Sequence, residues 1–259
     1  MLGMNWYVYD HYGYALIAAI GTFVALAGLQ CVIQCRQLRA LTTSLQGVAP
    51  PFINIVGVLF ALTLAFLAND TWIAHDRAFK AVYKEAESLH TIVTLSKRLP
   101  EPLKEELQQA VIAYAEANVS EWPDLANRKT NPAVSERADD LFTLIASSQI
   151  TVAAGAVVQE LMLRKMSDVT DERDQRIALS QTHVNPLKWL GMGFLGFLTL
   201  VSVAIVHLER PRAAFSAMLI FALAAAPTAA IVLVQGNPFQ PPSNVTPAPI
   251  IKAVAAPAD

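Results

Sequence analysis

The sequence predicts an all-α membrane protein with four transmembrane helices and a helical extramembrane domain inserted between the second and the third. Four runs without a charged residue each approach or reach the roughly 20 residues that a helix needs to cross about 30 Å of hydrocarbon. They are residues 14–34, 52–69, 189–206 and 213–234. The composition agrees, because 54% of the residues are hydrophobic and only 15% are charged. Of the 40 charged residues, 30 lie in residues 74–186, which indicates a separate water-exposed region.

We therefore expect four parts along the chain. Residues 1–73 form an N-terminal segment with transmembrane helices 1 and 2, and residues 74–185 form the helical extramembrane domain. Residues 186–234 hold transmembrane helices 3 and 4, and residues 235–259 form a Pro-rich tail that is extended or loosely ordered. In lipid every peptide N–H and C=O needs a partner within the protein, so each apolar run is expected to be a spanning helix.

Prolines set the expected ends of the second helix. Pro50 and Pro51 open it, since a proline in the first turn loses no hydrogen bond. The helical pattern then continues past the membrane as far as Leu99, because Pro100 disfavours helix in the residue before it. An amphipathic helix is expected next, over residues 103–122, and its apolar face needs a partner.

Two Asn-Pro pairs predict the starts of later helices. Asn131-Pro132 and Asn185-Pro186 each resemble an N-cap residue followed by a first-turn proline. The first pair is expected to open one helix over residues 133–182, with a packed middle and a strongly charged end. The second pair is expected to open the third span.

Loop charges predict the orientation, because Lys and Arg accumulate in short cytoplasmic loops. Arg36 and Arg39 follow the first span, and Arg210 and Arg212 lie between the third and the fourth. Both loops are therefore expected to face the cytoplasm, which places the extramembrane domain in the periplasm, outside a bacterial inner membrane. Three basic residues also follow the second span closely, so the inverted topology stays open. They are Arg77, Lys80 and Lys84.

The second span has two sides when it is wound at 100° per residue. One side carries bulky residues, a hydroxyl and a terminal acid, which suits the wall of a pore shared by several subunits. The candidate pore-lining residues are Val56, Phe60, Thr63, Leu67 and Asp70. The other side carries small residues that allow close helix approach. The helix-packing candidates are Ala61, Ala65 and Ala68. In the alternative, Asp70 marks the helix end in the headgroup layer, and Phe60 and Leu67 face lipid.

The chain lacks the sequence patterns of common enzyme sites. We find no nucleophile elbow, phosphate loop, zinc spacing or dinucleotide fingerprint, and therefore expect no enzyme, no cofactor and no metal. Cys31 and Cys35 share one helical face without further ligands nearby, so we interpret them as small packing residues. Residues 74–186 carry 13 basic and 17 acidic side chains, a net charge of −4, which disfavours nucleic acid as a partner.

Glu85 lies on the helical continuation of the second span, beyond the expected membrane. Its candidate partners for an ion pair are Arg77, Lys84 and residues 173–176. The sequence leaves these alternatives open, and a buried ion pair between helices is the mild interpretation.

Landmarks of a known family occur in order along residues 14–249. They are Glu85-Ala86, Leu99-Pro100, Tyr114, Glu121-Trp122-Pro123, Arg173, Arg176, Pro186, Trp189 and Asn237-Pro238-Phe239. In their order and spacing, these residues make the chain resemble the bacterial bestrophin-like membrane family of unknown function.

The resemblance implies distant kinship with bestrophins, which are pentameric anion channels with four membrane helices per subunit and a pore lined by the second. By that likeness, Phe60 and Leu67 take the place of the apolar neck, and the extended helices form an extramembrane vestibule. The chain departs from the pattern where Thr63 interrupts the apolar row and Asp70 ends it. The charged region also differs, because it is cytosolic in bestrophins and the loop charges place it outside here.

Two functions are compatible with the sequence. The first is a homo-oligomeric ion channel or pore-like protein, whose partners are membrane lipid, copies of itself and a permeant ion. A ring of Asp70 carboxylates would repel anions and concentrate cations, so the preference between anions and cations stays unresolved. The second is a non-conducting membrane-anchored sensor or scaffold whose outer helical domain binds a partner.

Overall fold

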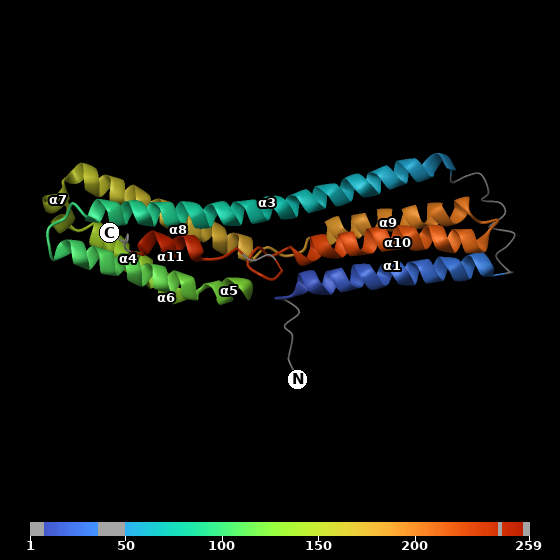
Figure 1. Ribbon diagram of the computed structural model, residues 1–259, viewed down its shortest axis with the longest axis horizontal. Coiled ribbons are helices and arrows are strands. Elements are labelled where there is room, and N and C mark those ends of the chain that lie inside the picture. The colour runs from blue at the N-terminus through green and yellow to red at the C-terminus, as the bar shows by residue number, and fades with distance from the viewer. Residues whose placement is uncertain (1–7, 36–49, 243–244, 256–259) are drawn as a thin grey trace, which may run out of the picture. The chain divides into compact units, whose positions relative to one another are not determined.

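Every element of the part of the chain described by the computed structural model, residues 8–35, 50–242 and 245–255, is a helix (Figure 1). The chain divides into two compact units. The first, here called the apolar unit, comprises Met1–Trp72 and His183–Gly236. The second, the charged unit, comprises Ile73–Thr182 and Asn237–Asp259. Among the residues used above to predict orientation, Arg36 and Arg39 lie outside the described residues.

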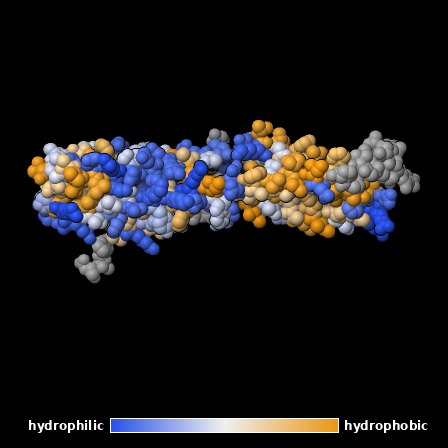
Figure 2. All heavy atoms as spheres, turned by 90° about the horizontal axis from the view of Figure 1, so that it is seen from above, coloured by the Kyte–Doolittle hydropathy of each residue, from blue (hydrophilic) through white to orange (hydrophobic). Residues whose placement is uncertain are grey.

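Four helices are long and apolar enough to cross a membrane, which confirms the four spans predicted from the sequence. They are α1 (Asp10–Gln34), α3 (Pro50–Ser96), α9 (Pro186–Val206) and α10 (Pro211–Val234). Within the apolar unit, α1 runs alongside α10, and α9 packs against both (Figure 1). On the face drawn in Figure 2, hydrophobic residues gather over these spans and hydrophilic residues over the charged unit.

Small side chains bring the three neighbouring spans together. Ala214 and Ala222 of α10 are fully buried against Leu26 of α1 and Ala204 of α9. Small residues allow close approach of helix backbones, which is how helices associate where water supplies no hydrophobic driving force. Close packing also requires a small residue directly after α10. A Cβ atom on Gly236 would overlap the ring of His11, a buried residue of α1.

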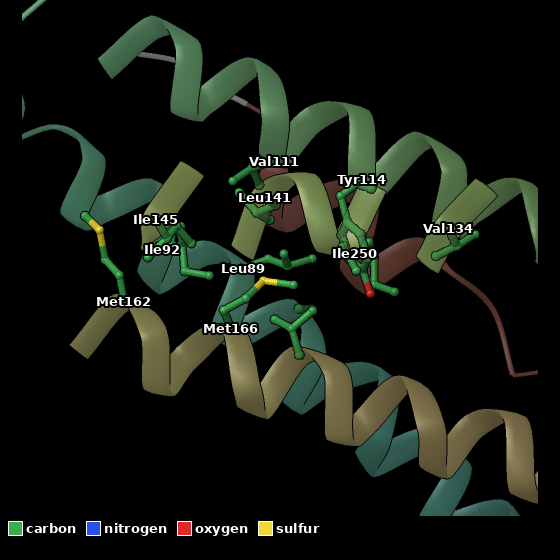
Figure 3. Close-up of a cluster of buried hydrophobic side chains, with 14 of the residues drawn as sticks. Leu89, Ile92, Val111, Tyr114, Val134, Leu141, Ile145, Met162, Met166 and Ile250 are labelled. Carbon is green, nitrogen blue, oxygen red and sulfur yellow. The ribbon is translucent and has the colours of Figure 1, made fainter. Parts of the chain in front are cut away.

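The charged unit is a helical assembly around one apolar core. Its helices are the part of α3 beyond Trp72 together with α4 (Leu103–Ser120), α5 (Trp122–Ala126), α6 (Pro132–Ile145), α7 (Ser148–Ala154), α8 (Ala156–Ser180) and α11 (Ala248–Val254). Figure 3 shows side chains from α3, α4, α6, α8 and α11 meeting in this core. Leu89, Val111, Leu141, Met162 and Ile250 are fully buried there.

Both predicted Asn-Pro helix starts are confirmed. Asn131 Oδ1 accepts a hydrogen bond from the N–H of Ala133, 3.1 Å away, at the start of α6. Asn185 Oδ1 accepts from the N–H groups of Leu187 and Lys188 at the start of α9. These bonds satisfy first-turn donors that have no partner inside the helix.

The expectation of one helix over residues 133–182 is wrong, because the chain breaks twice between α6 and α8. The second break is at Gly155, whose φ of 86° lies in a region that residues with a side chain rarely adopt. The second span also ends earlier than expected, at Ser96 instead of Leu99. Helical periodicity continued through both places and therefore concealed them.

The expectation of a loosely ordered tail is wrong as well. Phe239 and Ile250 are buried in the core of the charged unit, and α11 packs against α4. The indole N–H of Trp122 donates to the carbonyl of Val245 at 2.6 Å. The side-chain amide of Gln240 donates to the carbonyl of Ala126 at 2.7 Å. The many prolines of the tail thus accompany a packed segment.

Candidate functional site

Two of the candidate pore residues on α3 are buried within their own chain. Phe60 and Leu67 are only 9% and 7% exposed, and they pack in one cluster with Met192 of α9 and Val232 of α10. The ring of Phe60 also lies 5.5 Å from the ring of Phe221, measured between centroids. This side of α3 therefore holds α3 to the other spans of the same chain.

The remaining candidates are distributed around the helix. Val56 and Thr63 are partly buried, and the Thr63 hydroxyl donates to the carbonyl of Leu59 one turn earlier. Asp70 is exposed. Of the packing candidates, Ala61 and Ala65 are exposed and Ala68 is partly buried. Within one chain the bulky side packs and the small side is exposed, while the pore and packing assignments between copies stay predictions.

A second row of α3 residues points away from the rest of the chain, and sequence analysis did not single it out. Val58, Leu62 and Phe66 are 57%, 51% and 69% exposed. Asn54 and Asp70 extend the row by one step of four residues at each end and are also exposed. Residues four apart are neighbours on the surface of a helix, so the five form a continuous exposed ridge that is inclined to the helix axis. The sequence pattern that could have identified this ridge is the spacing of four residues with a polar residue at each end.

Asp70, at one end of this exposed ridge, is paired with a lysine of another span. Lys188 Nζ of α9 donates to Asp70 Oδ2 at 2.9 Å. Both side chains are more than half exposed, so the ion pair lies on the surface of the apolar unit. The sequence predicted the carboxylate but not its partner, because the two residues are 118 positions apart.

An apolar cavity of about 820 Å³, partly open to the surroundings, lies in the apolar unit among α1, α3, α9 and α10. Phe60 and Phe221 form part of its wall, with Thr22 and Tyr14 among its few polar neighbours. None of its described lining residues is charged. The cavity can hold hydrocarbon, but it offers no charged group to an ion.

The charged unit contains a completely buried ion pair between Glu85 of α3 and Arg176 of α8. Arg176 Nε donates to Glu85 Oε2 at 2.8 Å, and Arg176 Nη2 donates to Glu85 Oε1 at 3.2 Å. Among the open alternatives for Glu85, the structure therefore selects the 173–176 segment, while Lys84 pairs with Glu172. The guanidinium carbon of Arg176 lies 4.7 Å from the centroid of the Trp122 ring, a cation–π distance.

Neutral side chains of α4 complete this pair. The Tyr114 hydroxyl donates to Glu85 Oε1 at 2.8 Å, and the Asn118 amide both donates to Glu85 and accepts from Arg176. Burial, followed by the neighbouring Glu85 charge, raises the pKa of Tyr114 well above its usual value. The phenol therefore stays neutral and continues to donate.

A second buried pair joins Glu121 to Arg173 of α8. Arg173 Nη2 donates to Glu121 Oε1 at 2.7 Å and Arg173 Nε donates to Glu121 Oε2 at 3.2 Å, in a two-pronged arrangement. Burial opposes the Arg173 charge, but the bonds to Glu121 outweigh it and raise the pKa of Arg173. Glu121 also accepts from the backbone N–H of Asn131, which ties the start of α6 to the pair. Both pairs are closed to solvent, so they serve the fold of the charged unit.

The sequence matches a known protein family over most of its length. The bestrophin-like domain matches residues 20–250. The chain belongs to the bestrophin-like family. As a bestrophin-like protein with four spans, it is a multi-pass membrane protein. A comparison with curated proteins finds no match.

Solved structures share the bestrophin-like fold. A crystal structure of a variant of a bacterial bestrophin homolog from Klebsiella pneumoniae superposes with a TM-score of 0.69 at 13% identity, covering 92% of this chain and 96% of that chain. Crystal structures of two membrane protein variants give TM-scores of 0.65 and 0.64 at 14% identity. They cover 95% and 93% of this chain and 96% and 94% of their own. Likenesses at such identities show the fold alone.

We predict that Arg176→Met destabilises the charged unit by about 3–5 kcal/mol, because it leaves the Glu85 carboxylate buried without its counter-charge. Chemical unfolding of the detergent-solubilised protein, followed by tryptophan fluorescence, measures the change. Arg137→Met is the matched control, since Arg137 pairs with Asp140 on the surface and an exposed pair contributes about 0–1 kcal/mol. Equal unfolding midpoints for the two variants would contradict the prediction.

Proposed function

We propose that the chain is the subunit of a homo-oligomeric ion channel of the bacterial inner membrane and that α3 lines its pore. The observation that carries this proposal is the exposed ridge of α3. Val58, Leu62 and Phe66 form an apolar centre, and Asn54 and Asp70 put polar groups at its two ends. Apolar constrictions between polar mouths gate ion pathways by excluding water, and the exposed ridge has this order of residues.

The pathway in this proposal lies between copies of the chain. The cavity inside one apolar unit has no charged lining residue among those described, so it is a poor route for ions. A ring of identical subunits places one ridge from each copy around a common axis. Membership of the bestrophin-like family supports such an assembly, and likeness to the bestrophins favours five copies.

Two faces of α3 are candidates for lining the pore. The sequence predicted the face of Phe60 and Leu67, which the chain itself buries. The exposed ridge needs no rearrangement to face an axis, and we therefore prefer it. Asp70 belongs to both rows, so the proposal retains it at the pore mouth.

We further propose that the charged unit lies on the periplasmic side. Arg210 lies between α9 and α10 and Arg212 is in the first turn of α10, at the ends opposite to Trp72 and Trp189 along the spans. Basic residues favour the cytoplasmic loop, and tryptophans favour a membrane interface.

Purified protein reconstituted in liposomes is expected to conduct ions. Flux of chloride and of potassium, each measured with its own indicator dye, tests the proposed channel. Empty liposomes prepared in the same way are the control. Absence of flux for both ions would overturn the channel and favour the non-conducting sensor or scaffold.

Thiol modification distinguishes the two faces of α3. In a background in which Cys31 and Cys35 are replaced by serine, Val58→Cys and Leu62→Cys are expected to react with a charged, water-soluble thiol reagent and to lose current. Leu67→Cys is expected to be inert, because that side chain is packed against the chain's own helices. Leu190→Cys, on an exposed position of α9, is the control for a lipid-facing thiol. Reaction at Leu67→Cys but not at Leu62→Cys would restore the face predicted from the sequence.

The same cysteine-free background tests the orientation. Val157→Cys of the charged unit is strongly exposed, and Glu209→Cys is exposed between α9 and α10. An impermeant maleimide added to intact spheroplasts is expected to label the first and to reach the second only after permeabilisation. The reverse pattern would place the charged unit in the cytoplasm.

A further inference from the structure

Asp70 and Lys188 are isolated charges in otherwise uncharged stretches of α3 and α9. Asp70 is the single charged residue of α3 between Pro50 and Trp72, and Lys188 is the single charged residue of α9. These two residues nevertheless meet, with 2.9 Å between Lys188 Nζ and Asp70 Oδ2. Their side chains remain 56% and 57% exposed. This end of the exposed ridge therefore carries one positive and one negative charge per chain.

Stability gives little reason for this arrangement. Lys188 is in the first turn of α9, where the positive end of the helix macrodipole disfavours a cation. An exposed ion pair also contributes little to folding. The clear effect of the pair is electrostatic, because Lys188 cancels the field that Asp70 alone would impose on passing ions.

We infer that Asp70 and Lys188 form a charge-balanced ring at one mouth of the pore and that this balance sets the preference between cations and anions. This inference rests on the proposed channel and specifies the residues that determine its selectivity. It replaces the simple carboxylate ring expected from the sequence. Loss of Asp70 leaves a ring of ammonium groups, which attracts anions, and loss of Lys188 leaves a ring of carboxylates, which attracts cations.

Reversal potentials in planar bilayers test the inference, with KCl at about 0.1 M on one side and about 0.01 M on the other, where screening is weak. Asp70→Asn is expected to lower the K⁺/Cl⁻ permeability ratio about threefold, and Lys188→Met to raise it by about the same factor. The double variant Asp70→Asn/Lys188→Met and the exchanged variant Asp70→Lys/Lys188→Asp are expected to stay close to the parent ratio. In both single variants, most of the change in the K⁺/Cl⁻ permeability ratio should disappear at about 1 M salt, where the screening length falls to about 3 Å.

Asp140→Asn is the matched control, because it removes an acid from an exposed ion pair on α6 and should leave the ratio unchanged. Native mass measurement checks that every variant keeps the parent assembly. If the parent conducts and neither single variant shifts the ratio, the inference is overturned and the channel stands. If the double variant behaves like Asp70→Asn alone, Lys188 provides no compensation and the inference is again overturned. A parent without current removes the channel and, with it, the inference.

Discussion

A charge that leaves bulk water needs a counter-charge, and this constraint shapes the interior of the charged unit. In the apolar unit, Asp70, the one acid of α3 between Pro50 and Trp72, meets Lys188 of α9 at 2.9 Å, and both side chains stay exposed. In the charged unit, the buried Arg173 and Arg176 each bond to a buried glutamate. Neutral side chains of α4 fill the remaining positions around Glu85. Arg173 and Arg176 both come from α8, and their glutamates come from α3 and from the junction of α4 and α5, so the two pairs turn one face of α8 inward.

The features predictable from the sequence are those that depend on local chemistry. Span length follows from the thickness of hydrocarbon, so the four apolar runs were identified directly. The caps at Asn131 and Asn185 involve bonds across two or three residues, and these were identified as well. The family could be recognised because its landmarks, Glu85, Tyr114, Glu121, Arg173 and Arg176, are the residues that form the buried pairs.

The features that escaped prediction depend on distant partners. Winding α3 separates bulky from small residues, but it does not say which side meets α9 and α10, because every side of a span is apolar. The chain packs Phe60 and Leu67 inward and leaves the exposed ridge outward. Likewise, Lys188 is 118 residues from Asp70 and Arg176 is 91 residues from Glu85, beyond the range of any helical periodicity. The break at Gly155 escaped because an isolated glycine is tolerated within a helical pattern.

The charged unit is assembled from two stretches of chain that are separated by the third and fourth spans. Phe239 and Ile250 belong to its core, yet they are synthesised after α9 and α10. A nascent chain leaves the ribosome N-terminus first, at about 5–20 residues per second. The interior of the charged unit therefore stays incomplete until α9 and α10 have been synthesised. The core that α3 begins is therefore closed by Phe239 and α11, which follow α10 in the chain.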